Sequence, residues 1–104
     1  MYKLEYLPIA LQDMAEIARY ISHELQNPSA AEWISVKLVE SADGISAFPY
    51  ANSAYQPIRL LQREYRRLLV ENYLMFYWVD EPSQTVTIAR VIYVRRDYEK
   101  KLEK

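Results

Sequence analysis

The sequence contains no cysteine, one histidine and one glycine among its 104 residues. Without cysteine there is no disulfide framework and no thiolate chemistry, which is compatible with the reducing cytoplasm, where we expect the protein to reside. One histidine, His23, cannot build a zinc site alone, and nothing in the sequence indicates another cofactor. The chain also lacks a glycine-rich loop, so cradling of a nucleotide by backbone amides is not expected.

Long hydrophobic runs are absent as well. No apolar stretch approaches the roughly 20 residues that a membrane-spanning helix requires. The first segment, MYKLEYLPIALQDM, carries an acidic residue early and has no long apolar centre, so it does not resemble a signal peptide. The length fits one domain covering residues 1–104. We therefore expect one soluble domain and no membrane partner.

The net charge of −1 conceals an asymmetry between the two halves of the chain. Residues 1–52 hold three basic and seven acidic side chains, whereas residues 53–104 hold ten basic and seven acidic ones, giving −4 and +3. Seven of the eight arginines fall in the second half. Arginine presents a planar fork of donors that suits phosphate and carboxylate groups. A basic patch is one interpretation, and an ordinary solvated sheet surface is the other.

The first half predicts a strand followed by two helices. Residues 2–7 alternate like a short strand that ends before Pro8. Apolar residues then recur every three or four positions, which predicts a helix of about 18 residues. Asn27 and Pro28 suit the start of a second helix, which carries the same spacing to about Phe48. So short a connection predicts an antiparallel helical hairpin.

The second half predicts a three-stranded antiparallel meander. It is rich in aromatic and β-branched residues, and turns are expected at 71–72 and 80–83. The fold class is therefore α+β: an N-terminal strand at the sheet edge, the hairpin on one face, and a short C-terminal tail. We expect the other face to be partly exposed. Alternation along residues 73–79 separates two apolar sets, but periodicity does not tell which set packs on the helices.

Arginine and tyrosine dominate the chemistry of the second half. The chain has ten tyrosines, and six of them lie beyond residue 52 with the arginines. Interleaved arginine and aromatic side chains can hold phosphates and stack bases. They also serve as anchors in protein interfaces. Core or cross-strand packing remains the ordinary role for any single tyrosine, and His23 is expected on a helix surface.

Three segments together resemble the RelE/ParE superfamily of toxins from type II toxin–antitoxin modules. They are YLPIALQDMAEIARYI, NPSAAEWI and YRRLLVENYLMFYWVDEPSQTVTIARVIYVRRDYEKKL, and they cover nearly the whole chain. The resemblance implies the same α+β fold and a small cognate antitoxin that wraps and neutralises the toxin as a hetero-oligomer. The long helical pair and the SAAEWI segment are more similar to ParE than to RelE.

The resemblance implies two alternative activities. ParE-like members poison DNA gyrase, and RelE-like members cut mRNA on the ribosome without a metal. In the nucleases an arginine stands where this chain has Leu74, another matches Arg96, and a terminal tyrosine falls near Leu102. The missing arginine and tyrosine favour gyrase poisoning and leave enzymatic activity open, with a metal-independent mRNA endonuclease as the alternative and an inactive homologue as the remaining one. Catalytic candidates for that alternative are Arg66, Tyr93, Arg96 and Tyr98; the target-binding or antitoxin-binding candidates are Arg59, Arg66, Arg67, Arg90, Arg95 and Arg96.

Overall fold

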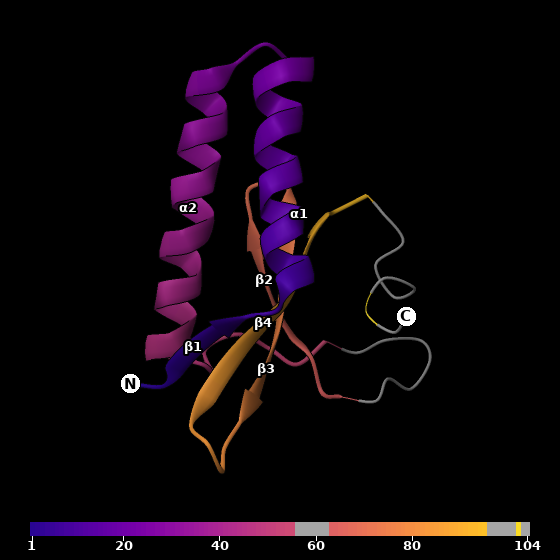
Figure 1. Cartoon of the computed structure of the whole chain (residues 1–104). Coiled ribbons are helices and arrows are strands. Elements are labelled where there is room, and N and C mark those ends of the chain that lie inside the picture. The colour runs from indigo at the N-terminus through magenta and orange to yellow at the C-terminus, as the bar shows by residue number, and fades with distance from the viewer. Residues whose placement is uncertain (56–62, 96–101, 103–104) are drawn as a thin grey trace.

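The computed structural model describes residues 1–55, 63–95 and 102 and confirms the expected order of elements (Figure 1). The fold is α+β, with a helical pair on one face of a four-stranded sheet. Among the described residues, no helix is long and apolar enough to cross a membrane. The elements are β1 (Lys3–Tyr6), α1 (Pro8–Arg19), a π-helical turn η1 (Tyr20–Glu24), α2 (Pro28–Ala47), β2 (Arg66–Val70), β3 (Tyr73–Asp80) and β4 (Thr85–Tyr93).

The helices begin where local chemistry favours a start. Pro8 occupies the first turn of α1, where its missing N–H costs nothing. The Asn27 side chain caps α2 by accepting a hydrogen bond from the Ala30 N–H at 3.1 Å. The single first helix expected from the sequence is divided, because α1 ends at Arg19 and the backbone continues as η1. Gln26, with a φ of 51°, then reverses the chain into α2.

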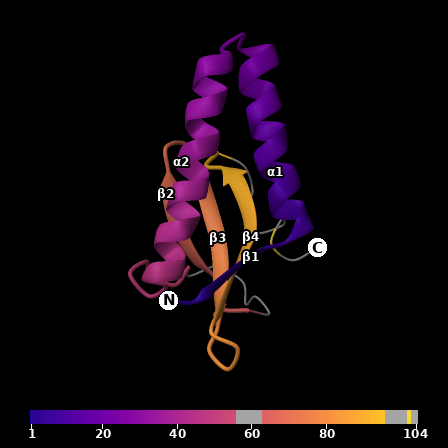
Figure 2. The same cartoon turned by 60° about the vertical axis from the view of Figure 1, so that its left-hand side comes forward.

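The sheet has the strand order β1-β4-β3-β2, so the N-terminal strand lies at an edge as expected. It runs parallel to β4, whereas β2, β3 and β4 form the expected antiparallel meander. Glu71 and Gln84 adopt left-handed φ values of 56° and 52° in the two turns. The hairpin extends past the sheet at the end where the two helices are joined (Figures 1 and 2).

The principal core lies between the helices and the sheet. Its members show which of the two alternating sets of apolar side chains along β3 faces the helices. Met75 and Tyr77 of β3 are fully buried in this core with Leu38 of α2 and Ile88 of β4. The buried Tyr77 hydroxyl is satisfied by donating to the Pro49 carbonyl at 2.7 Å. The helix-facing set of β3 is therefore Tyr73, Met75, Tyr77 and Val79.

The opposite face of the sheet is partly exposed along β2, as expected from the sequence, but its inner strands are largely covered. Leu74 and Phe76 point to this side and are 6% and 0% exposed. They belong to a second apolar cluster because Tyr55, Tyr65 and Leu102 lie over them. The chain before β2 thus supplies part of a second core. Its buried members are Tyr55, Tyr65, Leu74, Phe76, Ala89, Ile92 and Leu102.

One carboxylate joins the first helix to the edge of the sheet. The pairing of β1 with β4 ends at Ile88, and a register irregularity follows in β4. Beyond it, Asp13 of α1 accepts two hydrogen bonds from the Arg90 guanidinium, at 2.8 and 2.9 Å, and a third from the Val91 N–H at 3.0 Å. Both charged side chains are only 13% exposed, and the hydrogen bond to Asp13 raises the pKa of Arg90. Asp13 therefore caps the strand edge where β1 stops.

Replacing Asp13 with alanine should lower the free energy of unfolding by about 3 kcal/mol, because it removes the carboxylate that the largely buried Arg90 guanidinium and the Val91 N–H both contact. Urea unfolding followed by circular dichroism measures the change. Glu16→Ala is the matched control, since Glu16 is an exposed carboxylate on the same helix, and its effect should stay within about 0.5 kcal/mol. Equal losses for the two variants would contradict the role given to Asp13.

Candidate functional site

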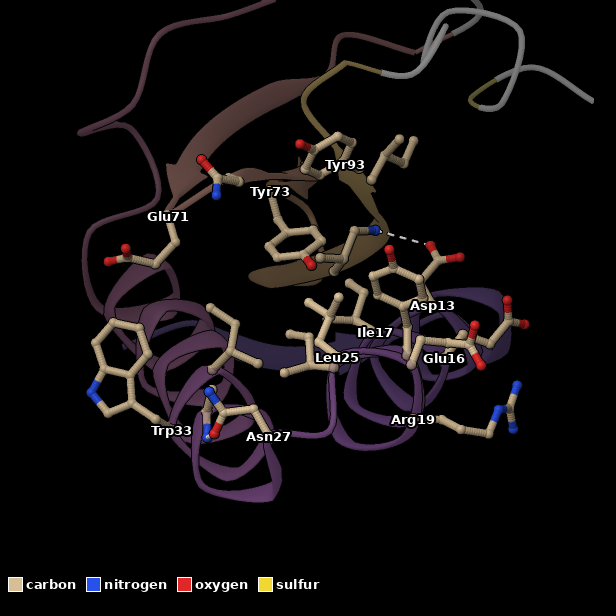
Figure 3. A pocket seen from close by; sticks show the side chains of 18 of the residues that line it. Asp13, Glu16, Ile17, Arg19, Leu25, Asn27, Trp33, Glu71, Tyr73 and Tyr93 are labelled. Carbon is tan, nitrogen blue, oxygen red and sulfur yellow. Dashed lines mark hydrogen bonds between the residues drawn. The ribbon is translucent and has the colours of Figure 1, made fainter.

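A groove of about 1120 Å³ lies between the overhanging end of the helical hairpin and the end of the sheet (Figure 3). It is bounded by α1, η1 and the start of α2 on one side, and by the β2–β3 turn and the end of β4 on the other. Tyr73 projects from the sheet toward Ile17 of α1 and toward Leu25, which follows η1. The groove arises because the hairpin is longer than the sheet that it covers.

The lining of the groove combines apolar and acidic groups. Tyr20, Leu25 and Trp33 line it although each is more than half exposed, at 53%, 57% and 54%. Among the charged lining residues, Asp13 and Arg90 neutralise each other, which leaves the carboxylates of Glu16, Glu24 and Glu71 against Arg19. No cluster of potential metal ligands is found among the described residues. An open, amphipathic groove of this kind suits a peptide segment.

Tyr93 and Arg95 lie at the end of β4 beside this groove. Tyr93 is the last residue of the strand, is 39% exposed, and contacts the Tyr73 ring edge-on at 5.8 Å between centroids. Burial raises the pKa of Tyr73. Arg95 is exposed in the turn that follows the strand.

A second feature, the arginine–aromatic surface, lies toward the other end of β2 and β3. Three guanidinium groups lie over aromatic rings: Arg63 over Trp78 at 4.1 Å, Arg66 over Tyr50 at 4.8 Å, and Arg67 over Tyr55 at 4.8 Å. Such cation–π contacts position a guanidinium while keeping its charge. We define this surface, which includes both sides of β2 because Arg66 and Arg67 face opposite sides of the sheet, as Arg63, Arg66, Arg67, Tyr50, Tyr55 and Trp78.

Arg66 connects this surface to the rest of the fold. Its guanidinium donates to the Asn52 carbonyl at 2.6 Å and lies over the Tyr50 ring. The Tyr50 hydroxyl donates to Glu81, which also accepts from the Tyr2 hydroxyl at 2.7 Å. These hydrogen bonds lower the pKa of Glu81, and the bond to Glu81 is the main reason that the pKa of Tyr50 rises to about 12. The network joins the residue before β1, the chain after α2, and the β3–β4 turn.

The structure separates the arginines that the sequence grouped together. Arg90 is bound by Asp13, and Arg66 is held by Asn52 and Tyr50. Arg67 is exposed on β2, and Arg95 is exposed in the turn after β4. Three candidates, Arg59, Arg96 and Tyr98, lie outside the described residues.

Sequence reasoning missed Arg63 and the groove. The alternation of Arg63, Tyr65 and Arg67 was a usable signal for Arg63, because two-residue spacing places side chains on one side of an extended chain. The groove left no local signal. It depends on how far the hairpin projects beyond the sheet, which no short sequence pattern encodes.

The family comparison agrees with this architecture. The model for "ParE toxin of type II toxin-antitoxin system, parDE" matches residues 4–98, most of the chain. The chain belongs to this ParE toxin family. No sequence among the curated proteins is significantly similar to it.

Solved structures show the same fold for this ParE-family toxin. A chain of the chromosomal ParDE system from P. aeruginosa superposes with a TM-score of 0.73 at 20% identity, covering 91% of this chain and 98% of that one. A chain of the RelBE2 toxin–antitoxin complex from Mycobacterium tuberculosis gives 0.64 at 20% identity, covering 88% and 96%. The isolated E. coli RelE toxin gives 0.54 at 17% identity, covering 97% and 93%. Identities this low establish the fold alone.

Glu81→Gln should lower the melting temperature of this ParE-family toxin at neutral pH, because it weakens the acceptor shared by Tyr2 and Tyr50. The pKa of Glu81 is lowered from its ordinary value of 4.5, so its contribution is present above that value and is lost as pH falls through the folded-state pKa. The difference between variant and parent should therefore shrink in acid. Thermal unfolding of variant and parent, measured from neutral pH down to below the pKa of Glu81, tests this difference in melting temperature. Glu71→Gln, in the turn at the other end of β3, is the control, and a constant gap between Glu81→Gln and the parent would contradict the assignment.

Proposed function

We propose that this toxin inhibits growth by poisoning DNA gyrase, in the manner the resemblance implies for ParE-like members, and that it does not cleave mRNA. The observation that carries the proposal is the apolar covering of the sheet face opposite the helices. Leu74, which stands where the resemblance implies a nuclease arginine, is 6% exposed within that covering. Leu102, near the expected terminal tyrosine, is 9% exposed in the same cluster.

An apolar cluster is a poor environment for RNA cleavage. Charge develops at a phosphate during cleavage, and it is stabilised by donors that are already positioned around it. Leu74, Phe76 and Leu102 offer no donor from their side chains, and a phosphate placed against them would lose its hydration without replacement. This part of the sheet supports packing instead of phosphoryl chemistry.

Tyr93 does not compensate for the missing groups. Along the sheet, Tyr93 pairs with Tyr73 and Tyr73 with Val70, whereas Arg66 lies four residues earlier on β2, opposite Tyr77. Four extended residues span about 13 Å. The Arg66 guanidinium is moreover held against Asn52 and Tyr50, whereas Tyr93 packs against Tyr73. The two side chains are therefore not arranged to act on one scissile phosphate, since acid–base groups must lie within hydrogen-bond reach of the reacting atoms.

An interaction toxin needs a surface, and the arginine–aromatic surface has a suitable composition. Arginine, tyrosine and tryptophan provide most of the anchors in protein interfaces. Arg63 and Arg67 are exposed, and each lies over an aromatic ring, so less side-chain freedom would be lost on binding than for an unsupported arginine. We propose that this surface contacts the target.

The decisive experiment uses antitoxin-free protein in two assays. Gyrase supercoiling with a readout for trapped cleavage complexes should give linear DNA, and primer extension on mRNA in a translating extract should show no new ends. Added cognate antitoxin should suppress the gyrase effect. New mRNA ends at codons without a gyrase effect would overturn the proposal in favour of RelE-like, ribosome-dependent cleavage. Silence in both assays would overturn both activities.

We further propose a cognate antitoxin whose segment adds to the outer edge of β2. Within the described residues, that edge is paired only by the bridge between Ala54 and Arg66. Beyond the bridge it presents the exposed Arg67 and the 59% exposed Leu69. The other edge is less open, because β1 is four residues long and leads directly into Pro8. An added strand carrying acidic and apolar residues would match Arg67 and cover Leu69.

Leu69→Asp should weaken antitoxin binding at least about tenfold, because it places a charge at the proposed contact with an acidic strand. Isothermal titration calorimetry with the cognate antitoxin measures the change. Leu11→Asp is the matched control, since Leu11 is 52% exposed on α1, away from this edge. If the two variants bind the antitoxin equally well, β2 is not the docking edge.

A further inference from the structure

The outward face of α2 is more apolar than a solvated helix face usually is. Trp33, Val36 and Val39 are 54%, 51% and 45% exposed, so none of them is engaged in either core. The buried residues of the same helix, among them Ile34 and Leu38, point to α1 and the sheet. This face is separate from β2 and from the arginine–aromatic surface.

Four exposed residues on this face form a line along the helix. Trp33, Lys37, Glu40 and Gly44 follow one another at steps of four, three and four residues, the spacing of a seam between two packed helices. The line is about 16 Å long at the rise of an α-helix. Lys37 already lies over its own Trp33 ring at 5.7 Å, so the two side chains share one patch.

Nothing in the described residues requires a glycine at position 44. A side chain built there would meet nothing within 4 Å, and its φ is not positive, so neither crowding nor backbone conformation requires glycine. A glycine inside a helix nevertheless costs about 1 kcal/mol relative to alanine. At Gly44 the exposed face of α2 therefore lacks a side chain, which leaves open space on the side of the helix that faces away from the core.

The line is complementary to itself in the antiparallel direction. Suppose that two copies of α2 pack antiparallel about a two-fold axis. Each residue of one copy then faces a residue of the other copy that lies equally far from the axis on the opposite side along the helix. The midpoint between Trp33 and Gly44 in the sequence falls between residues 38 and 39, and the midpoint between Lys37 and Glu40 falls at the same place. One axis therefore places each tryptophan over the gap at the partner's glycine, and each lysine against the partner's glutamate.

We propose that α2 is the interface of a symmetric dimer formed by two copies of this chain. The tryptophan–glycine contacts bury apolar area, and the two lysine–glutamate pairs fix the register. The contact consists of a single line of side chains on each copy, so the association is weak and depends on concentration. The proposal concerns the face of α2 and does not depend on the toxin's target.

Charge reversal tests the register. Sedimentation velocity on the antitoxin-free full chain should show a concentration-dependent equilibrium between monomer and dimer. Lys37→Glu alone, and Glu40→Lys alone, should each weaken dimerisation about tenfold or more, because two like-charge contacts replace two opposite ones. The double variant K37E/E40K restores both pairs and should return to within about threefold of the parent. Failure of the double variant to recover would overturn the antiparallel register.

Gly44→Leu tests the interface without endangering the fold. It fills open space and replaces a poor helix former, so thermal stability should rise while the dimer is lost. Glu32→Leu is the control, because it adds an apolar side chain off the line and should leave dimerisation intact. A chain that is monomeric at every concentration, or a dimer that survives Gly44→Leu, would overturn the proposal.

Discussion

The contact of Asp13 with Arg90 and Val91 is the interaction on which the architecture depends. The sheet is uneven at this edge, since β1 pairs with β4 only through Ile88 and, within the described part of the chain, no other strand pairs with the rest of β4 on that side. Asp13 takes the place of the missing strand by accepting from the Val91 N–H, and it neutralises Arg90 in the same geometry. The position of α1, and with it one wall of the groove, follows from this carboxylate.

The arginines show how one residue type is divided between structure and recognition. Arg90 is paired with Asp13 inside the fold, and Arg66 holds the loop after α2 through its hydrogen bond to Asn52. Arg63 and Arg67 are supported by aromatic rings but remain exposed. An abundance of arginine in one half of a chain therefore does not by itself define a basic site. The partners of each guanidinium decide how much of its charge is available to a ligand.

The sequence predicted the order of elements well, because the change from helical to alternating periodicity is local. It did not tell which face of β3 meets the helices, since both Met75 and Phe76 are apolar and both are fully buried. The second core was missed because it depends on Tyr55, Tyr65 and Leu102, which lie in segments without periodicity. Asp13 and Arg90 are 77 residues apart, so their pairing is a tertiary property that no local pattern reveals.

That separation has a consequence for the synthesis of the chain. The contacts of Asp13 with Arg90 and of Tyr2 with Glu81 join the beginning of the molecule to residues about 77 to 79 positions later. Contacts so distant in sequence close loops whose entropic cost must be met before any stabilisation is gained. The helical hairpin can form early during translation but docks only after β4 has been made. The toxin surface is therefore not complete until β4 has been synthesised.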